Sequence, residues 1–245
     1  MTENWSDKTV LVTGATGRLG SVMCEGLLSM GCRVIGTYFK GKDRNLSIEY
    51  IPLDITDSNS IDLLVKNLST KSIDIDWVVH NARSSDSLAI NADGWPSPEN
   101  FLNELTMAVT GPTYLTEKLL TFNSLTQIIF VSSIYGMVVP NFNIYSDIKD
   151  VPAIQYGVSK AAQLHLVKEM AIRLYKYSTR VNALVFGGVG GRASEEFYNR
   201  YSENCPQHRM LDNDDVLNGL LMALDPRQKS ITGQAFVVDG GWTLW

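Results

Sequence analysis

Short apolar runs rich in β-branched residues alternate with helical patterns along almost the whole chain, and this alternation constrains the fold more than any other feature. Short, continuously apolar runs are typical of buried parallel strands. They lie at Lys8–Thr13, Arg33–Tyr38, Tyr50–Leu53, Asp76–His80, Gln127–Ser132, Arg180–Phe186 and Gln234–Val238. Strands and helices that alternate with short connections predict right-handed crossovers. We therefore expect an α/β fold: a doubly wound, mostly parallel seven-stranded sheet with helices on both faces, which is Rossmann-like.

Two long helices are expected in the second half of the pattern. The first covers Phe101–Asn123 and should be kinked at Pro112, because proline removes a backbone donor. The second covers Ala153–Tyr177. The sequence has no internal repeat and no linker of biased composition, so we expect residues 1–245 to form one domain.

Composition and charge exclude several classes of function. The net charge is −5 and the basic residues are scattered, so we expect no nucleic-acid partner. No apolar run approaches the roughly 18 residues of a membrane span. The three cysteines form no CxxC pair, residues 1–4 begin no apolar signal segment, and the three histidines are too far apart to suggest a metal site. We therefore expect a cytoplasmic protein without a metal.

A glycine-rich segment joins the first predicted strand to the first predicted helix. Glycines at this place permit a tight turn and a close approach to a pyrophosphate, whose charge the start of the helix stabilises. An ordinary turn would also use glycine, but the position between strand and helix favours a nucleotide site. The residues predicted to contact the cofactor here are Gly14, Thr16, Gly17, Arg18, Leu19 and Gly20.

The end of the second predicted strand indicates which dinucleotide binds. An acidic residue there would hold the ribose 2′-hydroxyl and favour NAD, but Tyr38 occupies the expected position. Lys40, Lys42, Arg44 and Arg18 could instead neutralise a 2′-phosphate. A basic turn that faces solvent would contain the same residues without binding a phosphate. We nevertheless favour NADP(H) over NAD(H).

Further along the chain, several segments follow the glycine loop in a fixed order. They are Asp54 in LDITD, Asn81-Ala82 in HNAR, Ser133 in SSIYG, Tyr156 and Lys160 in YGVSKAA, Arg180–Ala183 and Val238–Gly241. Together they resemble the short-chain dehydrogenase/reductase family over nearly the whole chain. The resemblance implies an NAD(P)(H)-dependent enzyme that interconverts a carbonyl and an alcohol of a small molecule, and a homodimer or homotetramer. It also assigns Asp54, Ile55, Asn81, Ala82, Tyr156, Lys160, Gly187 and Val189 to cofactor binding.

The pair Tyr156 and Lys160 has a clear chemical rationale. The two residues are four apart, so both side chains project from one face of a helix. The pKa of a free phenol is about 10, and a nearby ammonium stabilises the phenolate. The resemblance makes Tyr156 the acid/base, lets Lys160 hold the nicotinamide ribose and lets Ser133 polarise the reacting oxygen. Tyr145 and Lys149 have the same spacing, but Pro152 follows too closely for a helix.

The sequence departs from the family's pattern around the expected active site. Ala108 stands where the resemblance expects an asparagine, Arg83 replaces a glycine, Phe186 replaces a proline, and Gly191 lies near the place of a missing threonine. The lost asparagine suggests a slowed or rerouted proton relay. A dinucleotide-binding sensor or partner subunit without catalysis, and an epimerase or dehydratase that retains its cofactor, therefore stay open as alternatives.

The substrate is expected to be polar. Arg83 follows the strand that ends near the nicotinamide and could bind a carboxylate or phosphate, although it could also face water. Tyr135, beside Ser133, could line the substrate pocket. SSIYG, the long loop 137–151 and a C-terminal DGGWT resemble a bacterial subgroup linked with surface-sugar and nonulosonic acid pathways. We expect that loop to overlie the cleft and the substrate to be a polar or anionic sugar-like molecule.

Overall fold

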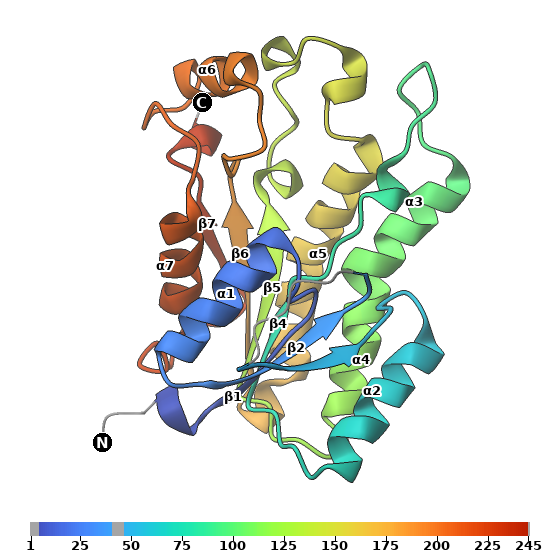
Figure 1. Ribbon diagram of the computed structural model, residues 1–245, viewed down its shortest axis with the longest axis vertical. Coiled ribbons are helices and arrows are strands. Elements are labelled where there is room, and N and C mark those ends of the chain that lie inside the picture. Colours follow the sequence, from blue (N-terminus) through green and yellow to red (C-terminus); the bar gives the residue numbers. More distant parts are fainter. Residues whose placement is uncertain (1–4, 41–46, 245) are drawn as a thin grey trace.

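The computed structural model describes residues 5–40 and 47–244, in which seven parallel strands form a sheet in the order β3-β2-β1-β4-β5-β6-β7 (Figure 1). The strands are β1 (Thr9–Val12), β2 (Arg33–Tyr38), β3 (Glu49–Pro52), β4 (Trp77–His80), β5 (Gln127–Ser133), β6 (Arg180–Phe186) and β7 (Ala235–Val238). The doubly wound, Rossmann-like α/β fold is thus confirmed. Each predicted run forms a strand, and the ends differ by at most one residue.

Helices cover both faces of the sheet. On one face lie α1 (Arg18–Ser29) and α7 (Asn213–Leu224), and on the other lie α2 (Ser58–Thr70), α4 (Gly111–Leu119) and α5 (Ile154–Arg173) (Figure 1). Side chains of successive strand residues point to opposite faces, so a strand buried on both sides must be apolar throughout. In β1, Val10 and Val12 belong to the core under α1 and α7, whereas Leu11 belongs to the core under α2 and α4.

The helix predicted over Phe101–Asn123 is interrupted earlier than expected. The structure has α3 (Pro98–Leu105), a π-helical turn (Thr106–Thr110) and then α4. The prediction of a kink at Pro112 is therefore wrong, because Pro112 lies in the first turn of α4, where its missing donor costs little. Gly111 allows α4 to approach the chain closely, since a Cβ on it would stand 2.0 Å from the carbonyl oxygen of Ile55.

The second long helix is shorter than predicted. α5 ends at Arg173, and a separate 3₁₀ turn (Tyr175–Tyr177) follows. Across the described ranges, no helix has both the length and the apolar character that crossing a membrane requires.

The strand order indicates where a ligand site lies in this fold. From β1 the chain continues to β2 on one side, and β4 then pairs with β1 on the other side. At such a switch point the loops diverge and leave a crevice at the carboxyl ends of the strands. The glycine loop after β1 and the HNAR segment after β4 both begin at this crevice.

Candidate active site

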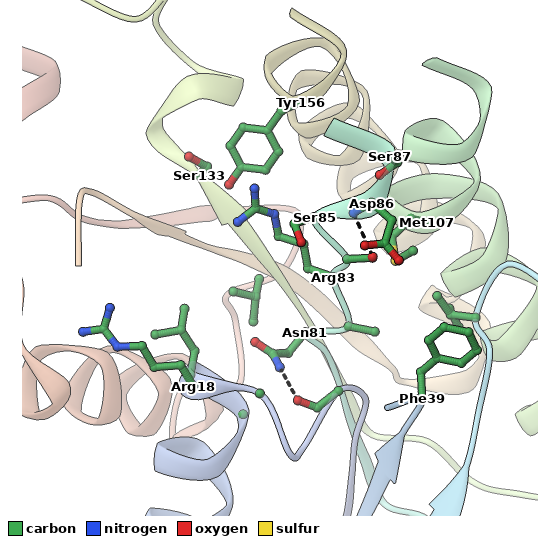
Figure 2. A pocket seen from close by; sticks show the side chains of 18 of the residues that line it. Arg18, Phe39, Asn81, Arg83, Ser85, Asp86, Ser87, Met107, Ser133 and Tyr156 are labelled. Atoms are coloured by element: carbon green, nitrogen blue, oxygen red, sulfur yellow. Dashed lines mark hydrogen bonds between the residues drawn. The ribbon is translucent and has the colours of Figure 1, made fainter. Parts of the chain in front are cut away.

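A cavity of about 1150 Å³ opens at the carboxyl ends of β1, β4, β5 and β6 (Figure 2). Ligand pockets commonly measure about 300–1,000 Å³, so this one has room for a dinucleotide and a small substrate together. The predicted site residues that line it are Gly14, Thr16, Gly17, Arg18, Leu19, Gly20, Asp54, Ile55, Asn81, Ala82, Arg83, Ser133, Tyr156, Lys160, Gly187 and Val189. The structure brings together predicted site residues that are up to 175 positions apart, from Gly14 to Val189.

The glycine loop forms a cradle that fits a pyrophosphate. Gly14 has a φ of +64°, and a Cβ on Gly20 would stand 2.2 Å from the carbonyl oxygen of Gly14. Asn81 holds the loop from β4, because its Nδ2 donates to the carbonyl oxygens of Thr13 (3.0 Å) and Gly14 (3.2 Å). Gly17 is the N-cap of α1 and provides no side-chain cap, and the first residues of α1 line the cavity, so the start of this helix can stabilise an anion there.

The end of the cavity next to β2 differs from the prediction. Phe39 and Lys40 line it, whereas Tyr38 does not. Arg18 is engaged elsewhere, since its guanidinium donates to the carbonyl oxygens of Val189 (3.2 Å) and Gly190, and Figure 2 shows it across the cavity from Phe39. Lys42 and Arg44, which were also considered for a 2′-phosphate, lie outside the described residues.

Tyr156 and Lys160 project from α5 toward the end of β5, where Ser133 lies. The Lys160 Nζ is 5.8 Å from the centre of the Tyr156 ring, and Arg83 stacks on the same ring at 4.5 Å. Figure 2 shows the side chain of Ser133 near the Tyr156 hydroxyl, with the Arg83 guanidinium close to that hydroxyl, and all three residues line the cavity. The three groups that the sequence predicts for acid/base chemistry are thus placed together.

Lys160 is buried, and its environment changes its acidity. Its Nζ donates to the carbonyl oxygen of Val131 (2.8 Å) and to Oε1 of Gln163 (3.3 Å). Its pKa is lowered to about 8, chiefly by burial and also by the nearby Arg83 cation, whereas the Glu104 carboxylate acts in the opposite direction. An amine with this pKa exchanges its proton near neutral pH more easily than a solvated lysine.

Tyr135 does not line the cavity. Its hydroxyl is 2.6 Å from that of Tyr145, and burial raises its pKa. Tyr145 lies outside any α-helix, so the alternative Tyr145–Lys149 pair is not arranged for catalysis. None of residues 137–151 lines the cavity either. The loop is held against α6 (Glu195–Glu203), because Arg200 donates to the carbonyl oxygen of Ile144 (2.7 Å).

Sequence reasoning missed one wall of the cavity and the layer behind it. The loop after β4, α3 and the π-helical turn that follows α3 provide this wall, which consists of Ser84, Ser85, Asp86, Ser87, Asn100, Asn103 and Met107. Behind it, the buried Glu104 accepts hydrogen bonds from the hydroxyls of Ser87 and Ser159 (3.4 Å for the second). Carboxylates are rarely buried without partners. Glu104 falls among apolar positions of its helix, and this position in the sequence could have indicated a buried, hydrogen-bonded carboxylate.

The described residues contain no group of three or more histidine, cysteine, aspartate or glutamate side chains that could hold a metal ion. His80 is buried next to the cavity, and its Nε2 is 2.9 Å from Oγ1 of Thr116. Burial lowers the pKa of His80 to about 3, so the ring is neutral at physiological pH. Its role is to pack β4 against α4.

Comparison with known proteins yields similarities over almost the full length. A family model described as enoyl-(acyl carrier protein) reductase matches residues 14–243. The post-translational flagellin modification protein A of Campylobacter coli is 28% identical, over 97% of this chain and 99% of its own. A short-chain dehydrogenase from Leptospira borgpetersenii, solved with bound NAD⁺, superposes with a TM-score of 0.88 at 25% identity, covering 99% of this chain and 97% of its own.

A further solved structure shares the fold. Gluconate 5-dehydrogenase from Burkholderia cenocepacia, in complex with NADP and tartrate, superposes with a TM-score of 0.81 at 16% identity. The alignment covers 97% of this chain and 96% of that protein. At this identity the likeness concerns the arrangement of the strands and helices alone.

Proposed function

Because the chain belongs to the short-chain dehydrogenase/reductase family, whose members are NAD(P)-dependent oxidoreductases, we propose that it reduces the carbonyl of a polar, anionic small molecule, or oxidises the matching alcohol, at the Ser133–Tyr156–Lys160 site. The observation that carries this proposal is the meeting of these three groups with the Arg83 guanidinium in the cavity that the glycine cradle opens. A nicotinamide bound there supplies or accepts the hydride.

In this proposal, three side chains have separate roles in proton transfer, polarisation of the carbonyl and stabilisation of the phenolate. In reduction, the Tyr156 hydroxyl gives its proton to the oxygen that becomes the alcohol, and in oxidation the tyrosinate takes that proton back. The Ser133 hydroxyl donates a hydrogen bond to the same oxygen and polarises the carbonyl. The Lys160 ammonium stabilises the phenolate that Tyr156 leaves. Two of the three ammonium donors are held by Val131 and Gln163, which leaves one for a ribose hydroxyl.

Arg83 favours an anionic substrate. Its side chain is exposed to the cavity, and within the described ranges its guanidinium has no hydrogen bond or ion pair and only stacks on Tyr156. A guanidinium held in this way can bind a carboxylate or phosphate with two parallel hydrogen bonds. The name of the Campylobacter coli relative, which refers to flagellin modification, is in keeping with a surface-sugar pathway, so we propose an acidic sugar-like substrate.

Replacing Arg83 by glutamine should raise the KM for carboxylate-bearing carbonyl sugars by about tenfold or more, because a charge-assisted pair is lost. The KM for neutral sugars of the same length should change much less. The measurement is NADPH oxidation over a panel of matched acidic and neutral sugars. Arg83→Lys is the control that keeps the charge but not the planar fork. An equal increase in KM for acidic and neutral sugars would show that Arg83 does not bind the anionic group of the substrate.

We also propose a preference for NADPH over NADH. The end of β2 carries no acidic residue, since Tyr38 stands there and Phe39 and Lys40 come directly after it. Lys40 lines the cavity and forms an ion pair with the exposed Asp86 (3.4 Å). Lys40→Glu should weaken NADPH binding by about tenfold, since it places a like charge near the 2′-phosphate, and should leave NADH binding nearly unchanged. Quenching of tryptophan fluorescence by each cofactor measures both affinities. Tighter binding of NADH by the unaltered protein would contradict the preference.

The proposal includes a homo-oligomer, as the family resemblance implies. β7 is an edge of the sheet among the described strands, and Val237 on it is exposed. Edge strands of this kind are surfaces on which a second copy can pack.

A further inference from the structure

A single buried side chain joins the lysine of the site to the π-helical turn that packs against α5. Gln163, on α5, is 2% exposed. Its Oε1 accepts a hydrogen bond from the Lys160 Nζ (3.3 Å), and its Nε2 donates to the carbonyl oxygen of Ala108 (3.0 Å). Ala108 lies in the π-helical turn between α3 and α4. The amide therefore spans from the ammonium on one helix to the irregular turn of another.

This bridge lies where the sequence departs from the family's pattern. The resemblance expects an asparagine at position 108, and alanine offers no polar side chain there. The backbone carbonyl of Ala108 is nevertheless engaged, and it is Gln163 that reaches it. A buried ammonium needs acceptors for its donors, because an unpaired charge away from water is very costly. Gln163 supplies one of the two acceptors that the structure gives to Lys160.

We propose that Gln163 is a positioning residue, whose amide bridge to the π-helical turn fixes the Lys160 ammonium toward Tyr156 in a site that lacks the family's asparagine. The bridge has a defined direction: the oxygen of the amide must face Lys160, because only the nitrogen can donate to the Ala108 carbonyl. The rotamer of the glutamine is thus fixed at both ends. The proposal rests on the proposed function only in assigning Lys160 to catalysis.

Three charged or titratable groups face Lys160 besides the neutral glutamine. Arg83 approaches from the end of β4, Glu104 from α3 and Tyr156 from the same helix as Lys160. Arg83 lowers the pKa of Lys160 and Glu104 raises it, so the two act against each other. An acceptor that carries no charge can hold the ammonium without disturbing this balance. Removing that acceptor should make the charged form less favourable.

The test follows the titration of Lys160 itself and needs no substrate. The full-length protein is labelled with [ε-¹³C]lysine, and the Lys160 signal is assigned by its loss in Lys160→Met. In the unaltered protein this signal should titrate near the value of about 8 given above. In Gln163→Leu the midpoint should fall by about one pH unit, and in Gln163→Glu it should rise by about one unit, because a carboxylate replaces the amide.

Gln127→Leu is the matched control. Gln127 is also a buried glutamine whose Nε2 makes one hydrogen bond to a backbone carbonyl, that of Leu224 (3.0 Å), but it lies at the opposite end of β5. Both leucine variants should lose similar thermal stability, and only Gln163→Leu should move the Lys160 midpoint. An unchanged midpoint in a folded Gln163→Leu protein overturns the proposal. If that variant does not fold, an unchanged midpoint in Gln163→Glu overturns it instead.

Failure of the bridge and failure of the proposed function give different results. If no carbonyl compound is ever reduced, the Lys160 midpoint still shifts when Gln163 positions the ammonium. If the enzyme is active and the midpoint does not shift, Lys160 is held by Val131 and its surroundings alone, and Gln163 only fills space.

Discussion

Replacing Tyr156 by phenylalanine should lower turnover by about 10²–10⁴-fold, the usual contribution of a positioned acid/base. The change removes only the hydroxyl, so the ring that Arg83 stacks on at 4.5 Å stays in place. The glycine cradle is built from other elements, the β1 loop and α1, and cofactor affinity should therefore be nearly unchanged. The measurement is kcat for NADPH oxidation together with the cofactor Kd from fluorescence quenching.

Tyr145→Phe is the natural control for this result. Tyr145 has the same spacing to a lysine as Tyr156, but its hydroxyl bonds to that of Tyr135 and lies outside the cavity. Its loss should change kcat by no more than about threefold, since it removes one hydrogen bond outside the site. Retained turnover in Tyr156→Phe, or a greater loss in Tyr145→Phe, would show that the proton is handled elsewhere.

Gly20→Ala should weaken binding of either cofactor by about 100-fold, because overpacking of a close-packed site costs about 1–3 kcal/mol and here displaces the binding loop itself. The added Cβ would stand 2.2 Å from the carbonyl oxygen of Gly14 and 2.9 Å from Cα of Ala15, both backbone atoms. Neither atom can move without shifting the turn that faces the pyrophosphate. Cofactor Kd measures the effect on binding, and a thermal melt without cofactor measures the effect on the fold.

Gly190→Ala provides the comparison, since the nearest heavy atoms to its added Cβ would be 3.5 Å away, an ordinary contact. Its cofactor affinity should stay within about twofold of the unaltered protein, because nothing needs to move. If Gly20→Ala bound cofactor as tightly as Gly190→Ala does, the glycine loop would not be the pyrophosphate cradle.

The sheet could be predicted from the sequence because its strands are buried on both faces. A run such as β6, Arg180–Phe186, must then be apolar along most of its length, and its ends are visible in the residues themselves. The interruption at Thr106–Thr110 could not be predicted in the same way. It is followed directly by Gly111, which lies against the Ile55 carbonyl, a contact between segments that are far apart in the sequence.

In the candidate site, too, the residues specified by local motifs could be predicted, and those that depend on contacts between distant segments could not. The predicted cofactor and acid/base residues sit on strand ends and one helix face, which a short motif specifies locally, and nearly all of them line the cavity. Tyr38 and Tyr135 do not line the cavity, because the direction of a side chain at a strand end or turn depends on its neighbours. Glu104 and Gln163 were not predicted, since their partners come from elements that meet only in the folded protein.

In the proposed function, hydride passes between a nicotinamide and the substrate carbon beside Tyr156. The most direct measurement of this transfer uses NADPH that carries deuterium at the transferring C4 position, an acidic carbonyl sugar, and mass spectrometry of the product. One deuterium should appear on the carbinol carbon, with one NADP⁺ formed for each product, and Tyr156→Phe should lower the rate of both by about 10²–10⁴-fold. Product formed without deuterium and without net NADP⁺, or cofactor bound with no product from any carbonyl, would contradict the proposed function.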